Sequence, residues 1–462
     1  MDESYVKSLS VSLPPELEEL KYAGYFDEFT EKAKYHLNRE DLPEIVKNRI
    51  ILEIHNQGII RREYTMTEKQ VFNGIAKYLP GFTEDDFAKL SGDVDYVFIN
   101  GRKRYANFSV SSLFITSRML REWPGSTYPK DTGTLVADAR KLMKKNGKAT
   151  VSHDLEFTCR VSKKAAEGCT LRVHLPYPNP ECDGIKNIEF ISSTGKCRIA
   201  PVGTLQRTAF FEVKGDEQRE FSVRVKADCK ETYMSYSDLL KAQAATTPAK
   251  EKKLRKAVRP SDLAEKAPHL VFTPFIKALS AKIVGNEKNK TKIAKRIYTY
   301  LTHEYSYAYV RDYAAIDNIG EYFGIRGRGD CGLQAALFIT LCRYNGIPAR
   351  WESGVCTDGS KGGCHDWCLI YLEGVGFRPV DVSFGGGAVR RNSKADNDFY
   401  FGNIDPYRMK FNTDFQEPFK PAKHEFRVDP YDNQRGEAET QSDMLTRREA
   451  RFDCIVRGKT IK

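Results

Sequence analysis

The chain has 462 residues, a formal charge of +11 and 40% hydrophobic residues, which is typical of about three domains with ordinary cores. Its mild basic excess is not accompanied by an RRM, zinc-finger or helix-turn-helix pattern, so the composition argues against nucleic-acid binding. No stretch approaches the roughly 18 consecutive apolar residues of a membrane span, so we expect no membrane insertion.

The N-terminus and the cysteines predict the compartment. The first residues, MDESYVK, are acidic and lack the basic and apolar regions of a secretory signal. The 11 cysteines are odd in number and irregularly spaced, which favours free thiols in a reducing compartment. We therefore expect a cytoplasmic protein, and the sequence leaves its oligomeric state open.

Residues 1–145 are predicted to form a mainly helical region. Apolar residues recur three and four positions apart between residues 16 and 60, and Thr83 before EDDF resembles a helix N-cap. Asn100-Gly101 stands between two short aromatic-rich runs, which is a strong signal for a two-residue β-hairpin. The region is therefore expected to end with a small hairpin.

Residues 148–235 change to a period of two, which predicts a small immunoglobulin-like β-sandwich. Apolar residues share one parity around Leu155 and again around Val223. The cysteines of this segment lack the short spacing of a zinc site, so we interpret them as core or edge residues rather than metal ligands or disulfides; they are Cys159, Cys169, Cys182 and Cys197.

Three further segments complete the predicted order. Residues 236–270 carry a run of Lys and Arg, which indicates a solvated linker or short exposed helix more than a patch for an acidic partner. Residues 271–412 contain the chemistry described next. Residues 413–462 form a charged C-terminal extension that either wraps the core or stays loose.

The segment CGLQAALFITLCRYN, residues 331–345, predicts a buried helix. It is apolar on nearly every face and ends at Asn345-Gly346. Asp330 occupies the N-cap position, so Cys331 is the first helical residue. There the partial positive charge of the helix is expected to lower the thiol pKa. The tripeptide Arg328-Gly329-Asp330 is then a lead-in to this helix rather than an adhesion motif.

Downstream residues could activate this thiol. His365 opens the alternating run WCLIYLE, and FRPVDVS is predicted to return as the next strand, carrying Asp381. In an antiparallel hairpin His365 and Asp381 come close together, although the register stays open. A cysteine nucleophile with a histidine base and an orienting carboxylate is the arrangement of thiol acyl-transfer enzymes.

These motifs together resemble the transglutaminase-like superfamily, which has a papain-like core. The resemblance rests on residues 329–332, 346–350, 365–367 and 379–381 and covers about residues 272–410. It implies an α+β fold in which helices pack on an antiparallel sheet, after a helical region and a β-sandwich. It also implies Cys331 as nucleophile, His365 as base and Asp381 as orienting acid.

The resemblance implies an enzyme that forms a thioester and needs no cofactor. No calcium-binding loop accompanies the motifs, so our first expectation is a cysteine peptidase or amidase acting on a protein or peptide. Protein-glutamine transglutaminase activity is the alternative within enzymes. A catalytically silent binding or scaffold protein is the alternative outside them.

Two local questions stay open at this stage. One oxyanion donor is expected at the Cys331 backbone N–H, and the second is unmarked, with three tyrosines as candidates: Tyr305, Tyr307 and Tyr309. A metal site is a less favoured interpretation of four clustered side chains, because their spacing is not a usual zinc pattern; they are Cys356, Cys364, His365 and Cys368.

Overall fold

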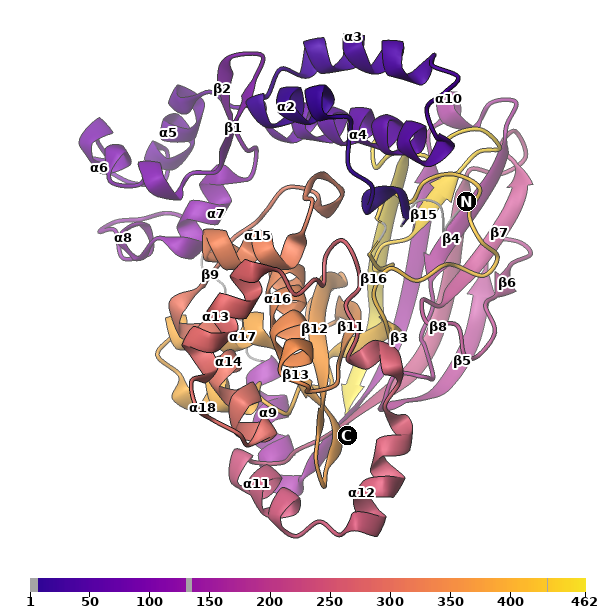
Figure 1. Cartoon of the computed structure of the whole chain (residues 1–462). Coiled ribbons are helices and arrows are strands. Elements are labelled where there is room, and N and C mark those ends of the chain that lie inside the picture. The colour runs from indigo at the N-terminus through magenta and orange to yellow at the C-terminus, as the bar shows by residue number, and fades with distance from the viewer. Residues whose placement is uncertain (1–6, 130–134, 430) are drawn as a thin grey trace.

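The computed structural model describes residues 7–129, 135–429 and 431–462. It combines helices with largely antiparallel sheets, which confirms the predicted α+β class. Figure 1 shows helices of the N-terminal region across the top, a β-sandwich on one side and a core of helices and sheet in the centre. No helix among the described residues is long and apolar enough to cross a membrane.

The N-terminal region is helical and contains one hairpin. Thr83 caps α6 through a reciprocal pair of hydrogen bonds with Asp86, and Asn100 and Gly101 adopt positive φ at the hairpin turn. The elements are α2 (Pro15–Ala23), α3 (Phe26–Leu37), α4 (Glu44–Glu63), α5 (Glu68–Ala76), α6 (Glu84–Ala88), β1 (Tyr96–Ile99), β2 (Arg102–Tyr105), α7 (Ser109–Thr116), α8 (Arg118–Arg121) and α9 (Leu135–Asn146).

Two four-stranded sheets form the sandwich, and each takes one strand from the C-terminal extension. The sheet orders are β16-β3-β8-β5 and β15-β4-β7-β6. The strands are β3 (Lys148–Val161), β4 (Thr170–Pro176), β5 (Ile185–Ser193), β6 (Arg198–Ile199), β7 (Thr208–Lys214), β8 (Glu220–Thr232), β15 (Glu437–Glu439) and β16 (Ala450–Ile461), with a short helix α10 (Lys163–Ala166). In Figure 1 the yellow β16 lies beside the violet β3.

The sandwich therefore extends beyond the predicted residues 148–235. The extension, residues 413–462, is neither a loose tail nor a simple wrap, because β16 pairs with β3 along most of its length. Many β16 side chains are exposed or half-buried. A half-exposed edge strand does not need the regular apolar alternation on which the sequence prediction relied.

The basic segment 236–270 is helical and packed against the core. It forms α11 (Tyr236–Ala244) and α12 (Pro248–Leu254). The Glu251 carboxylate accepts hydrogen bonds from the Tyr371 hydroxyl and the Gly374 backbone N–H, each at 2.8 Å. Asp262 is buried and pairs with Arg350. These contacts fix the segment to a hairpin of the core sheet, which a solvated linker would not do.

The core sheet has the antiparallel order β13-β12-β11-β14 and is packed by helices. The core as a whole, including a separate pair of short strands β9 and β10, has these elements: α13 (Pro274–Val284), α14 (Lys290–Glu304), β9 (Ser306–Tyr307), α15 (Ile319–Arg326), β10 (Arg328–Gly329), α16 (Cys331–Tyr344), β11 (Ala349–Cys356), β12 (Gly363–Leu372), β13 (Gly376–Val380), α17 (Val382–Arg390), α18 (Lys394–Phe399) and β14 (Arg408–Asn412).

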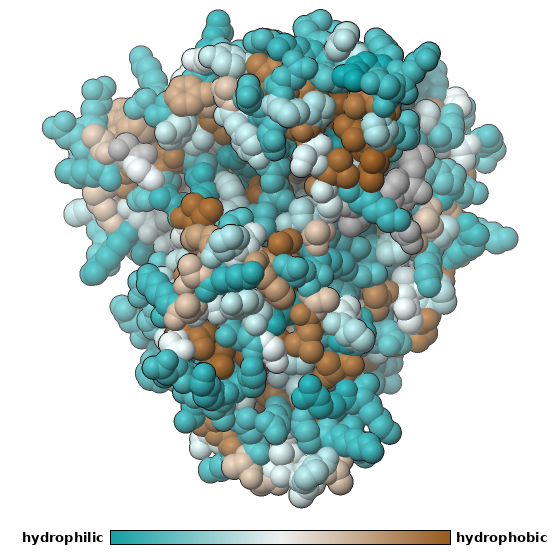
Figure 2. All heavy atoms as spheres, viewed as in Figure 1, coloured by the Kyte–Doolittle hydropathy of each residue, from teal (hydrophilic) through white to brown (hydrophobic). Residues whose placement is uncertain are grey.

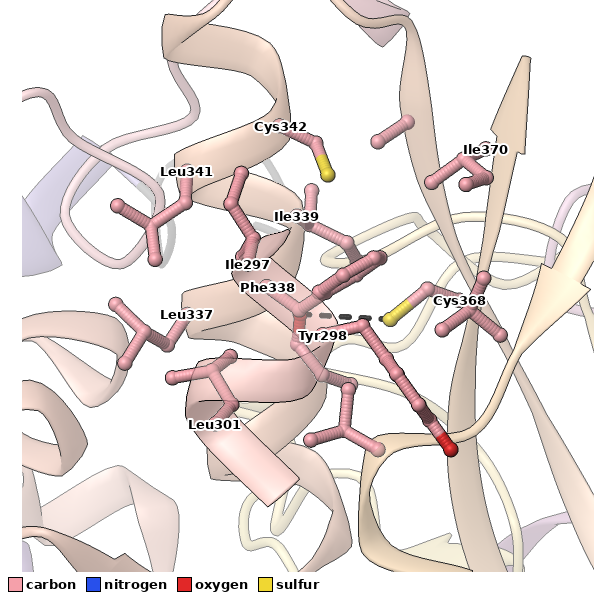
Figure 3. Packing of buried hydrophobic residues seen from close by; sticks show 14 of the residues in the cluster. Ile297, Tyr298, Leu301, Leu337, Phe338, Ile339, Leu341, Cys342, Cys368 and Ile370 are labelled. Atoms are coloured by element: carbon pink, nitrogen blue, oxygen red, sulfur yellow. Dashed lines mark hydrogen bonds between the residues drawn. The ribbon is translucent and has the colours of Figure 1, made fainter. Parts of the chain in front are cut away.

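Helix α16 is the centre of the largest apolar cluster. Figure 3 shows Leu337, Phe338 and Leu341 of this helix packed among side chains of α14 and β12. The Cys368 thiol on β12 donates a hydrogen bond of 3.6 Å to the Ala335 carbonyl. This packing fixes the start of α16 relative to the start of β12, where the predicted site residues lie.

The strand predicted to carry Asp381 ends one residue before it. Asp381 is instead the N-cap of α17, and its carboxylate accepts a hydrogen bond of 2.8 Å from the Phe384 backbone N–H. The run Gly385–Gly387 lies inside this helix. A Cβ on Gly385 would come within 2.0 Å of the Tyr298 hydroxyl, so glycine permits α17 to pack closely on α14.

Candidate active site

Cys331 begins helix α16, as the sequence predicts. The Asp330 carboxylate accepts a hydrogen bond from the Leu333 backbone N–H at 3.4 Å and another from the Tyr313 hydroxyl. Gly332 lies directly against the Tyr313 ring, where a Cβ would clash. Asp330 is therefore bound within the fold, which excludes the adhesion interpretation of the tripeptide at 328–330 in this conformation.

The environment of the Cys331 thiol differs from the one expected. Burial raises its pKa well above the ordinary value, and the carboxyl groups of Asp366 and Asp330 raise it further. The expected lowering by the helix N-terminus is therefore wrong for this conformation. Burial in a site with two carboxyl groups outweighs the partial charge of the helix.

Asp366 is the direct partner of the thiol and was not predicted. The Cys331 Sγ donates a hydrogen bond to the Asp366 Oδ2 at 3.2 Å. Burial raises the pKa of Asp366 well above its ordinary value, and the neighbouring carboxyl of Asp432 raises it further. Successive β12 side chains alternate between faces, so Asp366 shares the α16-facing side with Cys368. That parity was readable from the sequence.

His365 and Asp381 lie together, as the predicted hairpin requires. The His365 Nε2 and the Asp381 Oδ2 are 2.8 Å apart, and both residues are buried. The ring of His365 packs on Phe384, with centroids 4.5 Å apart. Among the described residues the imidazole makes no hydrogen bond to Cys331. The structure thus brings His365 to Asp381 and Cys331 to Asp366.

Arg408 on β14 is a second partner of Asp381 and was also missed. Its guanidinium is fully buried and forms ion pairs with Asp381 and Asp405. It also lies over the Phe384 ring at 4.5 Å. Burial alone would raise the pKa of Asp381, but the charges of His365 and Arg408 outweigh it, so this pKa is lowered.

The three candidate tyrosines divide into two groups. Tyr305 turns its hydroxyl to the Gly324 carbonyl, at 2.8 Å, and does not line the cavity over Cys331. Tyr307 and Tyr309 do line that cavity. Burial raises the pKa of Tyr307, and its neighbours Cys331 and Asp330 raise it further. The structure therefore leaves Tyr307 and Tyr309 as candidate oxyanion donors.

The alternative metal site is not assembled. Cys364 and Cys368 share one face of β12 and His365 occupies the other. The Cys364 Sγ accepts a hydrogen bond from the Arg435 Nε at 3.3 Å. No group of His, Cys, Asp and Glu side chains within the described ranges is arranged to hold a metal ion.

A cavity of about 260 Å³ lies over Cys331. Its walls come from three parts of the chain: Glu63 of the N-terminal region, Asp366 and Tyr307 of the core, and the C-terminal extension. From the extension, the Gln434 Nε2 donates hydrogen bonds to the His365 carbonyl, at 3.1 Å, and to the Asp366 carboxyl. The site is thus enclosed by segments that lie outside the core.

The family model of the transglutaminase-like superfamily matches residues 277–382. These residues form a transglutaminase-like domain. The match confirms the resemblance inferred from the motifs. It includes Cys331, His365 and Asp381, and it ends before the buried Arg408. Among curated proteins, no sequence matches the chain significantly.

Solved structures show distant likeness to the chain that holds this transglutaminase-like domain. A candidate cysteine protease from Cytophaga hutchinsonii is 13% identical, with 67% of this chain and 98% of that chain covered and a TM-score of 0.38. The periplasmic domain of TgpA from Pseudomonas aeruginosa is also 13% identical, with 59% and 100% covered and a TM-score of 0.27. These values carry no statement about the substrate of this chain.

Proposed function

We propose that the chain is a cysteine-dependent acyl-transfer enzyme that hydrolyses peptide or amide bonds through an acyl-enzyme at Cys331. The contact of 2.8 Å between His365 and Asp381 is the observation that carries this proposal. It orients an imidazole by a carboxylate in the domain whose central helix begins with a cysteine facing a cavity. This is the arrangement that a thiol nucleophile requires.

The proposed reaction requires that the thiol leaves Asp366 and meets the imidazole. Because His365 occupies the other face of β12 from Asp366, this step includes a rearrangement at the start of β12 when substrate binds. Because the His365 Nε2 is engaged by Asp381, its Nδ1 takes the thiol proton. The sulfur then attacks the substrate carbonyl, and the resulting oxyanion is held by the Cys331 backbone N–H, with Tyr307 as a candidate second donor. The imidazolium gives its proton to the leaving amine. Water, deprotonated by His365, releases the acid from the thioester.

One observation favours a second candidate, a catalytically silent binding module. The thiol is bonded to Asp366 rather than to the imidazole, and its pKa is raised. A neutral thiol is a poor nucleophile. If no substrate turns the side chain toward His365, the domain serves as a scaffold for a protein or peptide partner.

Turnover of a peptide and amide panel, with wild type and Cys331→Ala compared, tests the proposal. Activity that disappears in Cys331→Ala supports the enzyme, and transfer to an added amine in place of water would identify a transglutaminase. Cys342→Ala is a matched control, because Cys342 lies on the same helix but is buried away from the cavity. Absent turnover, together with partner capture unaffected by Cys331→Ala, would favour the scaffold.

A further inference from the structure

Two further hollows share wall residues with the cavity over Cys331. A hollow of about 230 Å³ adjoins it between α4 and the C-terminal extension and shares Glu63 and Asp312 with it. A second hollow, of about 340 Å³, shares Asp432 and Gln434 with it. Arg447 lines all three. The shared walls show that the three hollows adjoin one another near Cys331.

The hollow beside α4 is rich in guanidinium groups. Arg62, Arg447 and Arg448 line it. Arg447 has its nearest carboxylates at 3.9 Å, on Asp312, and at 4.0 Å, on Asp429. Within the part of the chain that the structure describes, Arg62 and Arg448 form no ion pair. Figure 2 shows a surface that is largely hydrophilic, with apolar side chains gathered in separate patches.

The carboxyl groups in this hollow offset the positive charge of the guanidinium groups only in part. Burial raises the pKa of Glu63 to about 7, so its carboxyl is partly neutral near neutral pH. Burial lowers the pKa of His55, so its ring is neutral there. Burial also raises the pKa of Asp429, the other carboxyl near Arg447, to about 7. Asp312 is then the main negative charge against three guanidinium groups. The excess of positive charge favours an anionic ligand.

We propose that Arg62, Arg447 and Arg448 form a subsite for a carboxylate of the substrate, next to the bond attacked at Cys331; this rests on the proposed function. Guanidinium groups match carboxylates in charge and in planar hydrogen-bonding geometry. The carboxylate belongs either to an Asp or Glu side chain or to a free peptide C-terminus. The substrate class is therefore an acidic peptide or one cleaved near its C-terminus.

Alkylation of Cys331 in the full chain tests the charge preference without requiring turnover. Iodoacetate carries a carboxylate and iodoacetamide does not, and mass spectrometry gives the rate at Cys331 for each. In Arg62→Gln/Arg448→Gln the ratio of the iodoacetate rate to the iodoacetamide rate should fall several-fold. Arg118→Gln, on the exposed face of α8, should keep the wild-type ratio. An unchanged ratio in the double variant would overturn the subsite.

Peptide substrates separate the two sources of the carboxylate. Two pairs of peptides are compared, each pair identical except at one group. One pair carries Glu or Gln at the same position, and the other ends in a free carboxylate or in an amide. A preference in kcat/KM for one acidic member that shrinks several-fold in the double variant supports the subsite and identifies the source. Cys331-dependent turnover with equal rates for all pairs would overturn the subsite and leave the proposed function intact. No turnover, with a shifted alkylation ratio, would refute the proposed function alone.

Discussion

Asp381 and Asp366 are both buried in the same candidate site, yet their pKa values shift in opposite directions. Asp381 faces an imidazole and a buried guanidinium, those of His365 and Arg408. Asp366 faces a thiol and a second carboxyl. The comparison teaches that burial alone does not decide whether a carboxyl is charged, because the neighbouring groups determine the sign. The neighbours of Asp381 thus favour its charged carboxylate, and the neighbours of Asp366 favour its protonated carboxyl.

The largest expected effect is the loss of catalytic rate when the charge of Asp381 is removed. Asp381→Asn removes the negative charge that orients His365 and stabilises its imidazolium, so kcat should fall roughly 10²- to 10⁴-fold. Steady-state kinetics on a substrate found for wild type measures it, with folding checked by circular dichroism. Asp453→Asn, at an exposed ion pair on β16, is the control. A loss below tenfold in a folded variant would contradict an orienting role.

Stability should respond strongly when Arg408 is removed. Arg408→Met leaves Asp381 and Asp405 buried without their cation, and breaking a buried pair in this way costs about 3–5 kcal/mol. Urea unfolding gives the change in free energy. Arg457→Met breaks a partly exposed pair with Glu156 and should cost at most about 1 kcal/mol. Equal losses of unfolding free energy in the two variants would show that the buried carboxylates do not depend on the Arg408 charge.

The buried carboxyl of Asp330 should make the free energy of unfolding depend on pH. Burial raises its pKa to about 6 from 3.8. The folded state therefore binds the proton more tightly than the unfolded state, and stability should fall as pH rises from about 4 to about 6, by at most about 3 kcal/mol.

The variant Asp330→Asn isolates this contribution. Asparagine caps a helix about as well as aspartate but does not titrate, so the variant lacks this part of the decline. The difference in unfolding free energy between wild type and variant, measured in urea at several pH values, should change across that interval. A constant difference would refute the raised pKa.

The smallest expected effect concerns the thiol itself. The hydrogen bond that the thiol donates to Asp366 favours the protonated sulfur, so Asp366→Asn should lower the pKa of Cys331 and speed its alkylation at pH 7 by roughly tenfold for each unit of pKa. The pH profile of iodoacetamide labelling measures it. Slower labelling would mean that Asp366 assists proton removal from Cys331 instead of opposing it.

Much of the site follows from local signals in the sequence. Helix α16 was predictable because Asp330 provides a cap, the following residues are apolar, and Asn345-Gly346 ends the helix. The neighbourhood of His365 and Asp381 was predictable because two short strands with a tight turn must pair. Both inferences depend on residues close together in the chain.

What could not be predicted depends on distant segments. Arg408 follows Asp381 by 27 positions, and nothing in RMKFN distinguishes a buried guanidinium from an exposed one. Gln434 belongs to a segment without regular periodicity, so its reach to Asp366 has no local signal. Helix α17 contains three consecutive glycines, which do not favour a helix in the sequence, and the close packing of Gly385 against Tyr298 depends on a distant segment. The cytoplasmic location stays a prediction.

The pairing of β16 with β3 has a consequence for the order in which the protein is made. Strand β3 is synthesised almost 300 residues before its partner, so the emerging sandwich has an open edge throughout that interval. Open edges can pair with other chains, and slow completion of a sheet prolongs that exposure. The same late segment supplies Gln434 and Arg447 to the cavity. The walls around Cys331 are therefore completed only after the whole core has been synthesised.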